Sequence, residues 1–518
     1  MARLPRMFTV CSNFFGRHRI ALGLSGALVA SLSGACSASL DFSECSKDSD
    51  CDRFDGAEPL RCEDNVCVVA ICSDNLTCAN LGDDQLCGLD ELCVDALQVP
   101  GCKWLVLPGG EVNNKLTVIG AVYDGSSAIG ELVRAAFVLA VEDFNAGASL
   151  GNGNQVGLIG CDSGGDLDQA KDAAVHLAEN VGVPAILGPL EDDAFIHVAQ
   201  KVSVKAGNLI FTMTPTATAP ISFSDSGILW RTIPGADYQG AAIAQRISDA
   251  GYESAVMVFR GDNYGLGLYQ ALTVEVEGQR VIEGVKSQSH LSYGVAEDGS
   301  GQIETLLSGS PNPDVIVLLG GDEVGEQLKK IVALEILPKR ILISHAGLRG
   351  VQSALIEMGD ADFAGRIEMI APLSAHPTNA PLLYERLQAT SNVVLGAEAP
   401  LAYDAAMTTL LAMRAIDGAT AITGPTIAQR MSRLTGGSPI SFGDIEGYKF
   451  VKSAADALSL GNTIDVIGTS GDLAFEPEFG QPCGPFVAWG FDDVVVPLPE
   501  LRSTFTVDCP EATGSWSP

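Results

Sequence analysis

From about Leu116 onward, short apolar runs alternate with stretches whose apolar residues recur at helical spacing. The run 116–122 predicts a strand, and 129–145 follows it with apolar residues three and four positions apart. Strands that alternate with helices form parallel sheets covered by helices, and this stretch is long enough for two such sheets. The sequence therefore predicts an α/β fold with two doubly wound parallel-sheet lobes. Further strands are expected at 155–161, 184–188, 209–212, 254–259, 281–284, 315–319 and 340–343.

The loops that follow these strands are the first place to look for a site. In open parallel sheets, ligands bind outside the carboxyl ends of the strands. The loops are rich in Gly, Ser, Thr and Asp, and their backbone N–H groups can hold polar ligand groups. They span 123–127, 188–193, 214–218, 260–264, 320–323 and 344–347.

The cysteines indicate a separate module before the α/β region. Eight of the 14 form a tandem repeat with the pattern C-x5-C-x(8–10)-C-x(4–5)-C. A segment with so few large apolar residues needs covalent staples to fold, so we predict a disulfide-rich module over 36–102. Zinc is the rival explanation, but the spacing lacks C-x2-C pairs and no His lies nearby. The repeated cysteines are Cys45, Cys51, Cys62 and Cys67, then Cys72, Cys78, Cys87 and Cys93.

Four cysteines lie beyond the repeat. Cys483 and Cys509 are near neighbours in sequence, so we expect them to pair. Cys102 and Cys161 are then the other pair, which would tie the module to the main domain.

The N-terminus has the features of an export signal. Its first 35 residues contain four Arg and no acidic residue, and the apolar stretch 20–35 is too short to span a bilayer. We therefore expect a signal peptide over 1–35. Ser33-Gly34-Ala35 before Cys36 resembles a bacterial lipobox, in which Cys36 becomes the acylated N-terminus. Ordinary cleavage after Ala35 is the alternative. These features predict a lipoprotein of the cell envelope, anchored to the outer membrane through lipid alone.

Charge excludes one class of partner. The chain has 64 acidic and 31 basic residues, for a formal charge of −33. Binding to nucleic acid depends on neutralising phosphates with Lys and Arg, so it is excluded. The histidines are scattered, and neither a nucleophile elbow nor a phosphate-binding loop is present. We therefore predict a protein without cofactor, metal or enzymatic activity.

Several stretches resemble a known family. IGAVYDGSSAIGELVRAAF (119–137), VPAILGPL (183–190), VMVFRGDNYGLGL (256–268) and TSGDLAFEPEFG (469–480) are similar to the type I periplasmic binding proteins. The similarity is to the branch that binds branched-chain amino acids and amides for ABC importers. It covers roughly 116–491 and implies two lobes with the ligand cleft between them.

The resemblance also implies domain boundaries. Lobe 1 would comprise 115–232 and 376–475, and lobe 2 would comprise 236–372 and 476–495. Residues 496–518 would then form a C-terminal tail.

Family binding positions carry over unevenly. The resemblance implies that Thr216, Ala217 and Thr218 hold a ligand head group and that Tyr264 lines the cleft. Where the family has a Ser, this chain has Glu191-Asp192-Asp193, and Ala346 beside His345 stands where the family has an acid. Asp192 and Asp193 either cap the following helix or favour a cationic, hydroxyl-rich or metal-bearing ligand. The predicted ligand-binding residues are Ser126, Ser127, Asp192, Asp193, Thr216, Ala217, Thr218, Tyr264, Asp322 and His345.

The predicted function is that of a solute-binding lipoprotein. It would close around a small polar ligand, amino-acid-like or amide-like, for ABC-type uptake or for sensing, with an ABC permease or an envelope protein as partner. The alternative is an envelope lipoprotein that uses the same fold as an interaction or regulatory scaffold.

Overall fold

The computed structural model describes residues 44–47, 50–51, 60–63, 65–69, 71–127, 129–214, 227–308, 312–391, 393–476, 478, 480–509 and 511–518. Signal peptide and lipidation, predicted for 1–36, lie outside these residues. The chain divides into two compact units, which are described separately. One contains Met1–Asp95 with Val112–Asn114, and the other contains Ala96–Glu111 with Lys115–Pro518.

The first unit is the disulfide-rich module. Each repeat contains one antiparallel hairpin: β1 (Leu60–Glu63) with β2 (Val66–Val69), and β3 (Gln85–Cys87) with β4 (Cys93–Asp95). In both repeats the first cysteine bonds to the third and the second to the fourth, a pairing that the spacing had left open. All eight sulfur atoms are therefore in disulfides, which leaves no thiolate among them for zinc. The bonds are Cys45–Cys62, Cys51–Cys67, Cys72–Cys87 and Cys78–Cys93.

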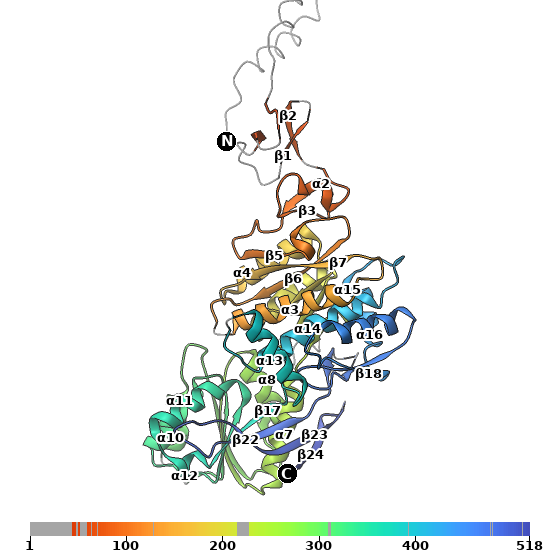
Figure 1. The fold of residues 1–518 in the computed structure, drawn as a ribbon. Helices are drawn as coiled ribbons and strands as arrows, with labels where there is room; N and C mark the ends of the chain where they lie inside the picture. The colour runs from red at the N-terminus through yellow and green to blue at the C-terminus, as the bar shows by residue number, and fades with distance from the viewer. Residues whose placement is uncertain are drawn as a thin grey trace, which may run out of the picture. The chain divides into compact units, whose positions relative to one another are not determined.

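The second unit is the α/β unit, and its described residues form two lobes. The lobe 1 sheet has the order β10-β9-β8-β6-β7-β5. Helices α3 (Gly130–Gly147) and α14 (Glu398–Arg414) pack together on one face of this sheet (Figure 1). On the other face, Leu177, which follows helix α4 (Leu167–Val175), packs against Gly120 of the sheet. The strands are β5 (Cys102–Val106), β6 (Leu116–Tyr123), β7 (Gln155–Asp162), β8 (Ala185–Leu187), β9 (Leu209–Thr212) and β10 (Leu229–Arg231).

Lobe 2 has the strand order β14-β11-β15-β16-β17-β22-β23-β24. Helices α7 (Ala236–Asp249) and α8 (Asn263–Leu272) cover one face, while α10 (Val324–Ala333) and α11 (Leu348–Met358) cover the other (Figure 1). The strands are β11 (Ser254–Arg260), β14 (Ser287–Tyr293), β15 (Val315–Leu319), β16 (Arg340–Ser344), β17 (Ile367–Pro372), β22 (Phe486–Gly490), β23 (Glu500–Asp508) and β24 (Thr513–Ser517). These two lobes confirm the predicted fold class.

The structure corrects the strand predicted at 281–284. Residues Gln279–Val281 form β13, which pairs with β12 (Val274–Val276) in a separate hairpin. The edge strand of the lobe is instead β14, which pairs in parallel with β11. Its sequence, SQSHLSY, is largely exposed. It lacks the apolar run by which buried strands are recognised.

The C-terminal segment 496–518 is not a tail. It forms β23 and β24, which extend the lobe 2 sheet in antiparallel register beyond β22. Phe505 is fully buried under α7, and the Trp516 indole donates to the carbonyl of Ala242 at 3.1 Å. The predicted Cys483–Cys509 disulfide is confirmed and fastens this hairpin to the crossing between the lobes.

The predicted Cys102–Cys161 pair is also confirmed, but it has a different role. Cys102 lies on β5, which pairs antiparallel with β7 and places Cys102 opposite Cys161. Both residues belong to the α/β unit, so the bond closes an edge of its sheet and does not tie the module to it.

The described chain passes between the lobes three times. It does so from β10 to α7, from β17 to α13 (Asn379–Thr390), and from β21 (Gln481–Pro482) to β22. The Arg231 guanidinium donates to Gln481 at 2.5 Å, which joins the first crossing to the third. Within lobe 2, the Gln239 amide of α7 donates to the carbonyl of Ile370 on β17 at 2.7 Å.

Candidate functional site

A cavity of about 910 Å³ lies within the α/β unit, and its wall comes from both lobes. Lobe 1 contributes the loops after β6, β7 and β8, and lobe 2 contributes the loops after β11, β15 and β16. The cavity is therefore at the carboxyl ends of the parallel strands, where the topology predicts a site. Its charged lining residues are Glu191, Asp192, Asp193, Arg260, Asp262, Asp322, Arg349 and Glu398, with His345 beside them.

In lobe 1 a tight turn places three acidic residues in the wall. Gly188, which follows β8, has a φ of 88°, and a Cβ there would lie 2.1 Å from the carbonyl oxygen of Val122. Only glycine fits this turn, which leads directly into α5 (Asp192–Val198). Glu191 is the N-cap, but its side chain makes no capping hydrogen bond. The Asp193 carboxylate instead accepts a hydrogen bond from Asn263 of lobe 2 at 2.6 Å. Asp193 therefore links the two lobes.

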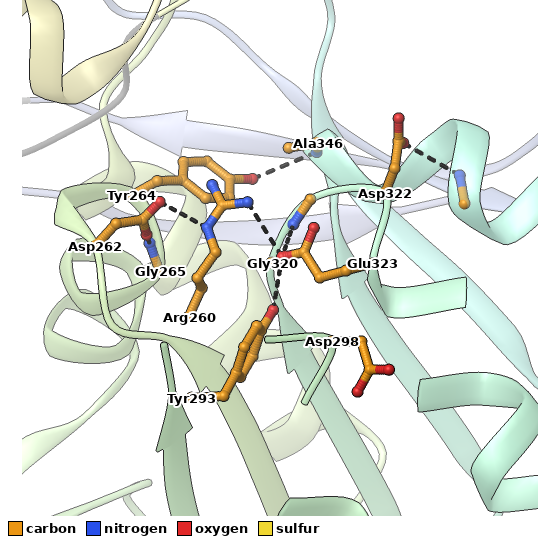
Figure 2. Close-up of polar contacts among 12 residues, drawn as sticks. Arg260, Asp262, Tyr264, Gly265, Tyr293, Asp298, Gly320, Asp322, Glu323 and Ala346 are labelled. Atoms are coloured by element: carbon orange, nitrogen blue, oxygen red, sulfur yellow. Dashed lines mark hydrogen bonds and ion pairs between the residues drawn. The ribbon is translucent and has the colours of Figure 1, made fainter. Parts of the chain in front are cut away.

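In lobe 2 an arginine is held by two carboxylates (Figure 2). Arg260, the last residue of β11, donates from Nε to Asp262 at 2.6 Å and from Nη1 to Glu323 at 3.1 Å. Asp262 also caps α8, since it accepts from the Gly265 N–H at 2.9 Å. Glu323 accepts further hydrogen bonds from the Tyr293 hydroxyl at 2.8 Å and from the Gly321 N–H at 2.8 Å. These bonds fix the loops after β11 and β15 against each other.

Tyr264 and His345 form the adjoining part of the lobe 2 wall. The Tyr264 hydroxyl accepts from the Ala346 N–H at 3.4 Å (Figure 2). The same hydroxyl lies 3.3 Å from Nδ1 of His345. Nδ1 of His345 is also 3.2 Å from Oε1 of Gln239, whose amide group is fixed by Ile370. An amide oxygen only accepts, so Nδ1 carries the proton and donates to it. Burial raises the pKa of Tyr264 and lowers the pKa of His345 to about 4, so both are neutral near pH 7.

A family model described as the receptor family ligand binding region matches residues 132–437, which is more than half of the chain. The chain belongs to this family. Glutamate receptor 3.7 of Arabidopsis thaliana is 28% identical over 193 residues, which cover 37% of this chain and 20% of that receptor. The chain thus spans about a fifth of the length of this curated relative.

Solved structures share the fold of this receptor-family region. A leucine-binding protein from Thermotoga maritima superposes with a TM-score of 0.56 at 17% identity, over 76% of this chain and 99% of that one. A solute-binding protein of an ABC transporter from Rhodopseudomonas palustris, solved with 3,4-dihydroxybenzoic acid, gives 0.56 at 14% identity, over 77% and 100%. The predicted leucine-binding-protein-like fold is confirmed, and family and fold are those of ligand-binding proteins. Among the described residues, no helix is long and apolar enough to cross a membrane.

The structure brings six of the ten predicted ligand-binding residues to the cavity wall: Ser127, Asp192, Asp193, Tyr264, Asp322 and His345. Ser126 lies outside the lining, where its hydroxyl donates to Asp124 at 2.6 Å. Thr216, Ala217 and Thr218 lie outside the described residues. That the six contact a ligand stays a prediction.

Sequence reasoning missed other parts of the wall. Arg260 and Asp262 were within a candidate loop but were not selected. Arg349 and Glu398 lie at the starts of helices α11 and α14, and Trp489 lies on strand β22. No local motif marks these three, because only the folded arrangement of the two lobes brings them to one cavity.

The pKa of His345 gives a prediction about this wall. The ordinary value is 6.5, so the unfolded chain takes up the proton more readily than the folded protein does. His345 therefore contributes stability above pH 6.5 that is lost as the pH falls through about 4. In an NMR titration, the His345 Cε1 proton should shift with a midpoint near 4. A midpoint near 6.5 would show that the ring is solvated and not held by its neighbours.

Proposed function

We propose that this protein is an exported solute receptor that closes around a small polar solute. The observation that carries the proposal is the cavity of about 910 Å³ whose wall is shared by the two lobes. A solute there contacts both lobes only when they are together, so its binding energy favours the closed arrangement. The volume is within the range of roughly 300–1,000 Å³ that is usual for small-molecule sites.

The wall suits a solute with polar and apolar parts. Charged groups are gathered around Asp192 and Arg260, whereas Leu167, Leu401 and Trp489 supply apolar surface. Small-molecule sites combine such apolar walls with a few polar groups that fix orientation. Solutes that carry amino or amide groups on an apolar frame have this character, and the structural relatives described above include a leucine-binding protein.

Polar contacts between the lobes flank the cavity. Asn263 of lobe 2 donates to Asp193 of lobe 1 at 2.6 Å. Arg349 of lobe 2 lies 4.0 Å from the Glu398 carboxylate of lobe 1. Such contacts form only when the lobes are together, so they add to the closing effect of a solute.

The cellular role is part of the same proposal. The basic and apolar N-terminal stretch, the lipobox-like residues before Cys36 and the abundance of cystines support export and a lipid anchor at the outer membrane. The solute would pass to an ABC permease or be sensed by an envelope protein.

A thermal-shift screen of the purified full chain tests the receptor function. A solute that binds only the folded protein raises its melting temperature, and a concentration of 100 Kd adds about 2.7 kcal/mol of stability. We expect a rise with at least one class among amino acids, amides, amines, sugars and aromatic acids. Ala346→Trp, which adds an indole to the cavity wall, should abolish the rise. Ala361→Trp, at an exposed position of α12 (Ala361–Ala364) outside the wall, should keep it. No rise with any class would contradict the receptor function.

One observation favours the alternative scaffold function. In the disulfide-rich module, Ile71, Leu76 and Leu89 are more than half exposed. Ile71 and Leu76 line a groove with Arg61, Asp74 and Asn114. Exposed apolar side chains beside a groove are typical of a protein-binding surface. A pull-down of an envelope protein that persists in Ala346→Trp but is lost in Ile71→Ser would favour the scaffold.

A further inference from the structure

The cavity wall is strongly acidic. Six carboxylates line it, against two guanidinium groups, and the described lining residues include no lysine. Lobe 1 contributes four of the carboxylates, Glu191, Asp192, Asp193 and Glu398, and no basic side chain. The stretch 215–226, which lies outside the described residues, contains no Lys or Arg and therefore cannot neutralise this charge.

Both guanidinium groups are already matched by carboxylates of the protein. Arg260 donates to Asp262 and Glu323, and Arg349 faces Glu398. A solute carboxylate would have to compete with these protein carboxylates for a positive partner. The wall is thus poorly suited to an anionic group.

Three hydroxyl groups of the wall are already engaged as donors. Ser127 donates to the carbonyl of Asp124 at 2.8 Å, Ser163 donates to that of Tyr123 at 3.2 Å, and Thr214 donates to that of Leu190. These hydroxyls present lone pairs, which accept from a donor such as an ammonium group.

The environment of Glu191 points in the same direction. Its side chain is exposed to the cavity but surrounded by protein, and this burial raises the pKa of its carboxyl. The negative charge of nearby Asp124 raises the pKa of Glu191 further. A positive group beside Glu191 would relieve both effects.

The size and the apolar surface of the cavity favour an organic cation over a metal ion. Among the described residues, only cysteine groups bring three potential metal-ligand atoms within 4.8 Å of one another, so the carboxylates of the cavity do not converge on a point. They are distributed over a wall that also contains Leu167, Leu401 and Trp489. Such a wall matches an aliphatic chain that carries separated positive charges.

We propose that the solute of this receptor is an aliphatic organic cation with one or more protonated amino groups and no carboxylate. The inference rests on the proposed receptor function and specifies its ligand. An ammonium group would lie between the Glu191–Asp193 turn of lobe 1 and the wall of lobe 2 that contains Tyr264 and Asp322. The aliphatic part would lie against the apolar surface.

Isothermal titration calorimetry with matched ligands tests the charge. Cadaverine and 1,5-pentanediol have the same carbon chain but end in ammonium and hydroxyl groups. We expect cadaverine or the longer spermidine to bind the full chain, and the diol to bind at least about 10-fold more weakly, as loss of a charge-assisted hydrogen bond implies. Leucine, 3,4-dihydroxybenzoate and calcium chloride complete the panel.

Matched variants test the location. Glu191→Gln and Asp322→Asn should each weaken amine binding by about 10-fold, because each removes one negative charge from the wall at nearly constant shape. Glu283→Gln and Asp456→Asn remove the same charges from exposed positions outside the wall and should leave the Kd unchanged. Melting temperatures without ligand show whether each variant is folded.

The outcomes separate this inference from the receptor function. If leucine, dihydroxybenzoate or the diol binds and the amines do not, the cationic ligand is refuted and the receptor function stands. If calcium binds in place of the amines, the organic cation is likewise refuted. If nothing in this panel or in the broader thermal screen binds, both proposals fail.

Discussion

An Asp404→Ala protein should lose about 3–5 kcal/mol of its free energy of unfolding. Asp404 is fully buried on α14, and its carboxylate accepts four hydrogen bonds from the segment after β19 (Ile464–Ile467). The N–H groups of Thr469 and Ser470 donate at 2.8 and 2.7 Å, and their hydroxyls donate at 2.8 and 2.6 Å. Alanine leaves these donors without their acceptor in the interior. Urea unfolding followed by circular dichroism measures the loss.

Two further variants make this result specific. Asp404→Asn keeps one oxygen but turns an NH₂ group toward donors, so its loss should lie between those of the wild type and Asp404→Ala. Asp456→Asn, on the exposed face of α16 (Tyr448–Ser459), should change the free energy by less than about 0.5 kcal/mol. A loss below about 1 kcal/mol for Asp404→Ala would mean that Thr469 and Ser470 find other acceptors.

The pH dependence of this loss follows from the pKa of Asp404. Burial raises that pKa from 3.8 to about 6, so the folded protein binds the proton more tightly than the unfolded chain. The contribution of Asp404 is therefore greatest below pH 3.8 and falls by up to about 3 kcal/mol as the pH rises through about 6. The difference between the wild type and Asp404→Ala should be larger at pH 4 than at pH 7.

The sequence predicted the main elements of the fold but not the contacts that join distant elements. Asp404 and its neighbour Tyr403 are both buried in α14, and the contacts that hold Asp404 come from residues 65 and 66 positions away. Apolar runs predicted the buried strands because they are covered on both faces. The same criterion missed β14, whose exposed polar residues give no apolar run, and it missed β23 and β24, which pack at the edge of lobe 2.

The candidate site was predictable where it depends on topology. Loops after parallel strands must gather at one edge of a sheet, so Asp192, Tyr264 and Asp322 could be selected from sequence. The pairing of Arg260 with Glu323 joins residues 63 positions apart, and Arg349 meets Glu398 only across the two lobes. No pattern of sequence spacing predicts contacts between residues so far apart. The net charge of the wall, on which the proposed ligand class depends, therefore required the structure.

Removing the Cys102–Cys161 disulfide by changing both residues to alanine should cost the α/β unit about 4 kcal/mol. The bond closes a loop of 59 residues, and the loss of its constraint on the unfolded chain grows with loop length. It also holds β5, the only antiparallel strand of the lobe 1 sheet among the described residues, against β7. The double alanine variant avoids leaving a reactive thiol, and urea unfolding under non-reducing conditions measures the effect.

The matched control is the Cys78→Ala/Cys93→Ala protein. Its bond lies in the disulfide-rich module and closes a loop of 15 residues, worth about 3 kcal/mol to that module alone. The urea transition of the α/β unit, followed through its near-ultraviolet circular dichroism, should stay unchanged in this control and move to lower urea in Cys102→Ala/Cys161→Ala. If both double variants shift this transition equally, the two units unfold together. The Cys102–Cys161 bond would then act on the whole chain and would not be specific to the edge of lobe 1.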